Sequence, residues 1–226
     1  MLPTVTDLQG KMPGKTLLIT AGMDGDEYAG IEAATQLIEA FPSRAFAGRL
    51  IVIPMMNIAG FEAGCSHNPM DKKYPKNIFP GRANGTASEQ LIDWLTKNFI
   101  HHADAWIDLH GGAKDEYLKP FIWTWETGVA EIDAFIKKFH HIVSADPIVF
   151  EHAGFFSKPK RLACLGCPYI MTESGQLGER NPPDIERHIL WVRELMGLME
   201  MMDWEHKNTH APIIKKSADG LWRKIN

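Results

Sequence analysis

Three cysteines are all that this chain of 226 residues contains, and three thiols are too few for a disulfide framework. They are typical of a protein from a reducing compartment. The chain also lacks an apolar run of the roughly 18 residues that a membrane-spanning helix needs. Its N-terminus has no basic segment followed by an apolar one, which is the pattern of a secretory signal. We therefore expect a cytoplasmic protein without a membrane span.

An excess of charge of one sign is missing as well. The chain has 24 Lys and Arg against 28 Asp and Glu, which gives a formal net charge of −4. This mixed, slightly acidic balance argues against nucleic acid or an anionic membrane as the main partner. A hydrophobic content of 45% is enough to bury one substantial core. We expect a small-molecule partner, and the composition leaves open whether the chain forms a homo-oligomer.

What the sequence does contain is an alternation of apolar strand-like runs with helical patterns. Strands are expected at 16–21, 49–54, 104–109, 118–124, 146–150 and 168–173, and helices at 28–41, 88–100, 129–142 and 183–203. Most of the strand-like runs are continuously apolar, as in strands that are covered on both faces. The alternation predicts an α/β fold, with a mostly parallel mixed sheet flanked by helices in three layers.

The composition changes after Asp203, where the chain becomes polar. The segments 213–214 and 219–222 are expected to pair as a short hairpin. We therefore predict a main, catalytic domain at 1–203 and a short C-terminal extension at 204–226, which is too small to form a domain by itself.

Acidic side chains follow the first predicted strand, and a histidine ends another. Asp24 and Glu27 precede the helix at 28–41, and His110 closes the strand at 104–109. In open α/β sheets, ligands bind at the carboxyl ends of the strands. Two acids and an imidazole meeting there could hold a catalytic metal ion with an open coordination position. The competing interpretation is that Asp24 and Glu27 only stabilise the start of a helix.

A C-x-x-C pair, Cys164 and Cys167, suggests a redox or zinc site. Only Cys65 remains to complete a thiolate zinc site. We interpret the pair as small apolar residues around a turn before a strand, and a redox role stays open at this point. The long connection at 55–87 has little periodicity, and such loops in compact domains are usually functional.

Five ordered segments of the chain form one pattern. They are residues 21–28 (AGMDGDEY), residues 57–64 (NIAGFEAG), residues 79–81 (FPG) with Gly85, Thr86 and Glu89, residues 108–110 (DLH), and residues 172–175 (TESG). In this order they resemble the first metal loop, the asparagine-containing loop, the phenylalanine-proline-glycine segment, the second metal motif and the strand-end glutamate of one family. That family is the succinylglutamate desuccinylase/aspartoacylase family, a branch of the zinc carboxypeptidase-like hydrolases.

The resemblance implies a zinc carboxypeptidase-like three-layer fold and a metal-dependent hydrolase that cleaves an amide bond. The substrate would be a small acylamino acid or a peptide-like molecule. The resemblance further implies that Glu27 and His110 are zinc ligands, and that Glu173 is the catalytic acid and base that activates the metal-bound water. It implies one divalent ion per chain.

The chain departs from the family pattern at the metal loop. Asp24 stands where the family has a histidine, and we expect Asp24 to be the third ligand because a carboxylate can bind zinc. Oxygen ligands also favour harder ions, so Mn²⁺ is an alternative to Zn²⁺.

A second departure lies in the substrate loop, where Ser66 replaces an arginine and Lys76-Asn77 replaces an Asn-Arg pair. The predicted substrate-binding residues are Lys76, Asn77 and Arg82.

A third departure is that family members usually continue into a C-terminal β-domain, of which 204–226 would be a remnant or the start. The pocket would then be more open, or be covered by another subunit, or the chain would be a shortened form.

These departures keep a second hypothesis open. The chain could be a catalytically degenerate family member that binds a ligand or a partner without turning it over.

Overall fold

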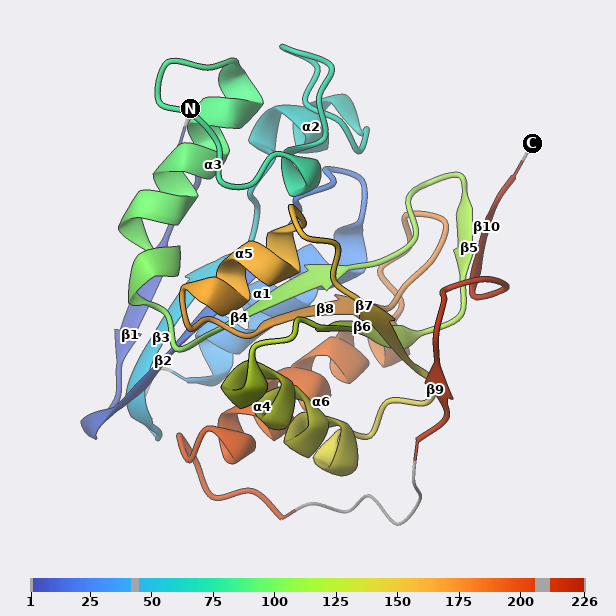
Figure 1. Ribbon diagram of the computed structural model, residues 1–226. Coiled ribbons are helices and arrows are strands. Elements are labelled where there is room, and N and C mark those ends of the chain that lie inside the picture. The colour runs from blue at the N-terminus through green and yellow to red at the C-terminus, as the bar shows by residue number, and fades with distance from the viewer. Residues whose placement is uncertain (1, 42–44, 206–211, 226) are drawn as a thin grey trace.

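Eight strands form the main sheet of the computed structural model, which describes residues 2–41, 45–205 and 212–225 (Figure 1). Their order in the sheet is β1-β3-β2-β4-β8-β6-β7-β9. The strands are β1 (Thr6–Gln9), β2 (Met12–Ala21), β3 (Ala47–Ile53), β4 (Ala105–His110), β6 (Phe121–Glu126), β7 (Ile148–His152), β8 (Tyr169–Glu173) and β9 (Ile214–Lys215). Neighbouring strands are parallel except β1 with β3 and β6 with β8. The predicted mostly parallel, mixed sheet is confirmed.

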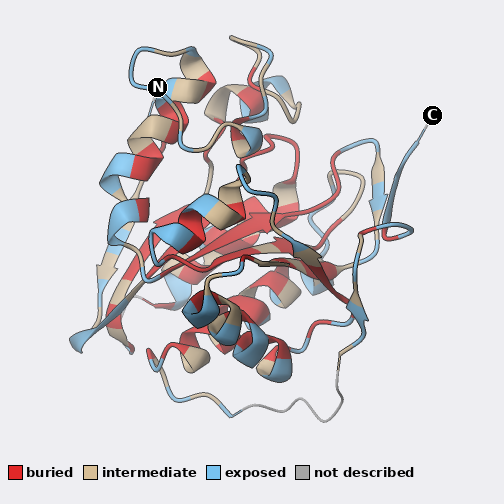
Figure 2. Ribbon diagram, in the orientation of Figure 1, coloured by how far each residue is buried: buried red, intermediate tan, exposed pale blue. Residues whose placement is uncertain are grey.

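Helices cover both faces of this sheet (Figure 1). One face carries α1 (Tyr28–Ala40), α4 (Ala130–Ile142) and α6 (Pro182–Leu198), and the other carries α3 (Ala87–Asn98) and α5 (Lys158–Cys164). Successive residues of a strand point to opposite faces, so Leu17 packs in the first layer and Leu18 in the second. Figure 2 shows that the sheet between the two layers is buried. The three-layer α/β architecture is therefore confirmed.

The elements differ from the predicted ones mainly at short segments. The strand β1, the helix α2 (Ile58–Ala63), the helix α5 and the 3₁₀ helices Pro75–Asn77 and Ile100–His102 were not expected. The predicted helix at 183–203 is too long, since α6 ends at Leu198. Glu200 adopts a left-handed conformation with φ of 58°, which cannot continue a right-handed helix.

The predicted hairpin at 213–222 is wrong. Strand β9 pairs in parallel with β7, and β10 (Trp222–Lys224) pairs antiparallel with β5 (Glu116–Leu118). An isolated two-stranded hairpin is marginal in water, whereas the edges of β7 and β5 offer unpaired backbone groups. Residues 206–211 of the predicted extension lie outside the described residues. None of the helices in the described ranges is both long and apolar enough to cross a membrane.

Three adjacent parallel strands determine where a site can form. Strands β2, β4 and β8 are neighbours, so their carboxyl ends lie at the same edge of the sheet. The register pairs Thr20 with Asp108 and His110 with Glu173. Side chains that follow β2 and side chains that end β4 and β8 are therefore brought to one place.

Candidate metal centre

A cluster of Asp24, Glu27 and His110 lies at this edge of the sheet. One ligand atom from each residue lies within 4.8 Å of the others, and all three residues are buried. Asp24 and Glu27 come from the loop between β2 and α1, and His110 is the last residue of β4. The structure thus brings together the three residues that the sequence suggested as metal ligands.

Close packing fixes the loop that carries the two acids. A Cβ atom on Gly25 would lie 2.2 Å from the carbonyl carbon of Gly60, so only glycine allows this approach to α2. Asn57 caps α2 by accepting a hydrogen bond from the backbone of Gly60, and its amide donates to the carbonyl oxygen of Ser66 at 3.1 Å. The hydroxyl of Ser66 in turn donates to Asp26 at 2.8 Å. Asn57 and Ser66 therefore hold the acidic loop in place.

Carboxylates hold both nitrogens of the His110 ring. The Nδ1 atom lies 2.8 Å from Oε2 of Glu27, and the Nε2 atom lies 3.2 Å from Oδ2 of Asp108. Asp108 is itself fixed by the hydroxyl of Thr20 at 2.6 Å and by that of Tyr169 at 2.9 Å. A carboxylate behind a ligating histidine orients the ring and raises its basicity. Asp108 is in position for that role, with Nδ1 facing the cluster.

Burial and neighbouring charges shift the pKa values of this cluster in different directions. Burial lowers the pKa of His110, but Asp108 and Glu27 outweigh it and raise that pKa well above its usual value. Burial, with Glu27 nearby, raises the pKa of Asp24 to about 7, although Lys76 and His110 act against the shift. In the absence of a metal, the imidazolium of His110 balances part of the acidic charge.

Glu173 ends β8 directly opposite His110 in the strand register. Burial and the charge of Glu27 raise the pKa of Glu173 well above its usual value. The two chain segments that follow these residues approach closely. A Cβ on Gly111 would lie only 2.4 Å from the carbonyl oxygen of Ser174, so glycine is needed there. A carboxyl group with a raised pKa beside a metal cluster is a candidate for proton transfer.

The ammonium group of Lys76 pairs with Oδ2 of Asp24. Lys76 belongs to the 3₁₀ helix Pro75–Asn77 of the long loop, and its side chain is 31% exposed. Burial lowers the pKa of Lys76, but Glu27 and Asp24 outweigh it and raise that pKa above its usual value. Sequence reasoning treated Lys76 as a substrate contact and missed its pairing with Asp24. A residue in a loop without periodicity gives no signal of such a contact.

The other two predicted substrate contacts lie elsewhere in the loop. Asn77 is exposed next to Lys76. The exposed guanidinium of Arg82 donates to Glu89 at 2.8 Å, and Glu89 forms a capping box with Thr86 at the start of α3. The structure therefore brings Lys76 to the acidic cluster and leaves Arg82 bound to Glu89.

A second lysine, Lys158, lies behind the cluster and was also missed. Its ammonium donates to the hydroxyl of Tyr169 at 2.6 Å and lies 4.1 Å from the centre of that ring. It also lies 3.7 Å from Oδ2 of Asp108. Burial lowers the pKa of Lys158 to about 8, although Asp108 acts against the shift. Sequence reasoning had no indication of it, because the short helix α5, which Lys158 begins, was not expected.

The donor set fits a divalent metal ion. Within the described residues, Oδ1 of Asp24 is a buried oxygen that accepts no hydrogen bond. A buried carboxylate oxygen without a partner is costly, and a cation would satisfy it. Two carboxylates and an imidazole are ligands that both Zn²⁺ and Mn²⁺ accept. The three side chains are thus suited to hold such an ion.

The cysteine pair lies apart from this chemistry. Cys164 is exposed at the end of α5, and Cys167 is buried before β8. Burial raises the pKa of the Cys167 thiol to about 12, whereas reactive thiols have lowered pKa values. The geometry favours the interpretation of the pair as part of a turn before a strand.

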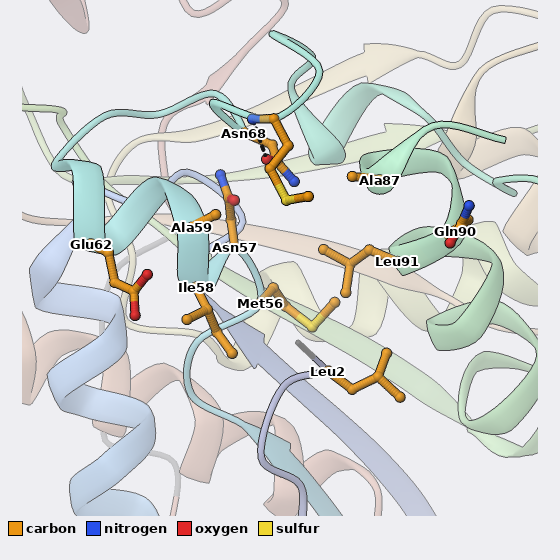
Figure 3. A pocket seen from close by; sticks show the side chains of 11 residues that line it. Leu2, Met56, Asn57, Ile58, Ala59, Glu62, Asn68, Ala87, Gln90 and Leu91 are labelled. Atoms are coloured by element: carbon orange, nitrogen blue, oxygen red, sulfur yellow. Dashed lines mark hydrogen bonds between the residues drawn. The ribbon is translucent and has the colours of Figure 1, made fainter.

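A separate hollow lies beside the asparagine-containing loop (Figure 3). Its lining is mostly apolar and includes Leu2, Met56 and Leu91, with Asn57 and Gln90 among the polar groups. The acids and the histidine of the cluster are not part of this lining. The hollow therefore contributes no group to the metal centre.

Comparisons with known proteins agree with this fold. A sequence profile of the succinylglutamate desuccinylase/aspartoacylase catalytic domain matches residues 13–196. An N-alpha-acetyl-L-2,4-diaminobutyric acid deacetylase from Halomonas elongata is 35% identical over 121 residues, which are 54% of this chain and 35% of that protein. This chain thus spans about a third of the length of that curated relative.

Solved structures share the fold at low sequence identity. A succinylglutamate desuccinylase from Silicibacter sp. TM1040 aligns with a TM-score of 0.87 at 22% identity, over 97% of this chain and 67% of that one. The product-bound ectoine utilization protein EutE (DoeB) from Ruegeria pomeroyi aligns with a TM-score of 0.85 at 23% identity, over 96% of this chain and 66% of that one. These likenesses support the architecture. Because the family profile covers most of the chain and the fold agrees with it, this protein belongs to the succinylglutamate desuccinylase/aspartoacylase family.

Proposed function

We propose that this protein is a metal-dependent hydrolase that cleaves the amide bond of a small N-acylated amino acid or peptide-like substrate. The observation that carries the proposal is the buried cluster of Asp24, Glu27 and His110, with ligand atoms within 4.8 Å of one another. The name of the Halomonas relative, a deacetylase of an acetylated amino acid, supports amide hydrolysis as the reaction class.

The three cluster residues would hold one Zn²⁺ or Mn²⁺ ion. When bound, such an ion polarises the scissile carbonyl and lowers the pKa of the attacking water. Asp108 would keep the His110 ring oriented with Nδ1 toward the ion, as its contact with Nε2 at 3.2 Å does now. The hydroxyls of Thr20 and Tyr169 hold Asp108 in turn, so the orientation of the ring is fixed from behind.

Glu173 would transfer the protons of the reaction. Its carboxylate takes a proton from the attacking water and gives it to the nitrogen of the leaving amine. The raised pKa of Glu173 supports this role, because a carboxyl group with a raised pKa is a better proton acceptor than an ordinary one when ionised, and when protonated it can donate to the leaving amine.

Cationic and polar groups of the long loop would bind the carboxylate of the substrate. Lys76 is the member of this set whose ammonium meets the cluster, and Asn77 lies next to it on the same 3₁₀ helix. Arg82 would have to leave Glu89 before it could take part.

The test combines metal content with turnover. Purified protein is loaded with Zn²⁺ or Mn²⁺, the metal is counted, and release of free amine is followed with a panel of N-acetyl and N-succinyl amino acids. We expect about one ion per chain and hydrolysis of at least one substrate. Glu173→Gln should lower the rate by about 100-fold or more while the metal stays bound. A protein that binds neither ion and hydrolyses no member of the panel would refute the proposal.

One observation favours a second candidate, a degenerate family member that binds a ligand without turnover. The ammonium of Lys76 already satisfies one oxygen of Asp24. In that case calorimetry would detect binding of N-acylated amino acids to protein treated with a chelator, and no amine would be released with either metal.

A further inference from the structure

Two departures from the family pattern meet in one contact. Asp24 stands where the family has a metal-binding histidine, and Lys76 stands where it has the asparagine of an Asn-Arg pair. In the folded protein the ammonium of Lys76 pairs with Oδ2 of Asp24. The two changed positions lie 52 residues apart in the sequence, yet their side chains are in direct contact.

The ammonium lies where it compensates the charge of the whole cluster. Besides Asp24, the carboxylates of Glu27 and Glu173 also stabilise the charged form of Lys76. A divalent ion bound to the same acids would likewise compensate their negative charge. Because like charges repel, the ammonium and a metal ion oppose each other at Asp24.

The two partners of this ion pair differ in their freedom to move. Asp24 is 1% exposed, and its loop is packed against α2 at Gly25. The side chain of Lys76 is 31% exposed and reaches in from a short 3₁₀ helix, so the ammonium can turn toward solvent. Lys158 offers no such freedom, because it is held between Tyr169 and Asp108.

We propose that Lys76 is a built-in counter-cation that competes with the divalent metal ion for Asp24. The ammonium neutralises Asp24 in the metal-free protein, and metal binding displaces it toward solvent. There it becomes available to the carboxylate of a substrate. This inference rests on the proposed metal site. Through the Lys76 side chain, metal binding would raise the affinity for substrate, and substrate binding would raise the affinity for metal.

The first test measures the affinity of the full chain for Mn²⁺ and Zn²⁺ alone by calorimetry. We expect Lys76→Met to bind the metal about tenfold or more tightly than the wild type, because the competing charge is gone. Lys72→Met is the matched control, since Lys72 is exposed in the same loop and the substitution removes the same charge. The control should leave the affinity unchanged.

The outcomes separate this inference from the proposed function. If the wild type binds metal and Lys76→Met binds it no more tightly, the competition is refuted and the metal site stands. If only Lys76→Met binds metal, the competition is supported and the metal-dependent function of the wild type fails. If neither protein binds metal, both proposals are refuted.

A second test needs no variant and covers the case in which Lys76→Met does not fold. The wild-type protein is labelled with an amine-reactive ester, with and without saturating metal, and the modified lysines are located by mass spectrometry. We expect metal to raise the labelling rate of Lys76 severalfold and to leave that of Lys72 unchanged. An equal rate at Lys76 in the metal-bound protein would overturn the proposed displacement.

Discussion

Asp24 is a source of instability in the metal-free protein, and replacing it should therefore stabilise the fold. Burial and the charge of Glu27 raise the pKa of Asp24 from 3.8 to about 7. An acid whose pKa is raised in the folded state contributes stability that is fully present below its unfolded pKa and is lost as the pH rises through the folded value. A difference of about 3 units corresponds to about 4 kcal/mol in the free energy of unfolding above pH 7.

The perturbation is Asp24→Asn, which keeps the shape of the side chain and removes its charge. In the presence of a chelator, we expect the free energy of unfolding at pH 8 to rise by about 2–4 kcal/mol over the wild type. At pH 4 the difference should shrink below about 1 kcal/mol, because Asp24 is then protonated in the fold and only partly ionised in the unfolded chain. Urea denaturation followed by tryptophan fluorescence at each pH gives both values.

Asp108→Asn is the matched comparison, because the same change is made at a second buried acid of the same site. Burial opposes ionisation of Asp108, yet His110 and Lys158 hold its pKa well below the usual value. Its carboxylate also accepts hydrogen bonds from Thr20 and Tyr169. We expect Asp108→Asn to destabilise the protein at pH 8 by about 3 kcal/mol or more. If Asp24→Asn were also destabilising at pH 8, the ion pair with Lys76 would outweigh the cost of burial and the reasoning would be refuted.

Three further predictions concern the loop, the core and the protons of the site. Gly25→Ala should weaken metal binding by about tenfold or more, because its Cβ would lie 2.2 Å from the carbonyl carbon of Gly60. Gly154→Ala, whose Cβ would meet nothing within 4 Å, should bind as the wild type does, and equal calorimetric affinities in the two variants would contradict the packing argument. Burial lowers the pKa of His188 to about 4, so its contribution to stability is present above about pH 6.5 and is lost as the pH falls toward 4. We expect this histidine to account for about 3 kcal/mol of acid destabilisation, and urea midpoints of His188→Gln that fall as steeply with pH as those of the wild type would exclude it. Since two carboxylates raise the pKa of His110 well above its usual value, metal binding at pH 7 should release about one proton, seen as a calorimetric enthalpy that depends on the buffer. An enthalpy independent of the buffer would show that His110 is already neutral.

The central part of the fold could be predicted because its signals are local and repeated. The continuous apolar runs that became β2, β4 and β8 need cover on both faces, and this requirement fixes a parallel sheet between helices. The short elements could not be predicted in this way. Helix α5 and strands β1 and β9 are too short for periodicity, and they form because the sheet and its edges provide partners. The division of the chain at residue 203 stays a prediction.

The candidate cluster was predictable from topology, whereas its surroundings were not. Asp24, Glu27 and His110 follow strands that proved to be neighbours, so the carboxyl-end rule was sufficient to bring them together. The role of Asp108 had a weak signal, because residues two apart in a strand share a face and Asp108 lies two before His110. The pairing of Lys76 with Asp24 had none, since it depends on the path of a long loop across the site.

This pairing changes how the departures from the family pattern should be tested. Taken separately, an aspartate in place of a histidine and a lysine in place of an asparagine each look like the loss of a site residue. Together they add one negative and one positive charge, so the net charge of the pair equals that of the neutral histidine and asparagine. The single reversal Asp24→His would leave the ammonium of Lys76 beside a neutral imidazole and a metal ion.

We therefore expect Asp24→His to bind Zn²⁺ no more tightly than the wild type, and Asp24→His with Lys76→Asn to bind it about tenfold or more tightly. A double-mutant cycle on the Zn²⁺ affinity should give a coupling of about 1 kcal/mol or more between the two positions. Strictly additive effects would show that the two substitutions are independent, and that the contact between their side chains does not govern the metal site.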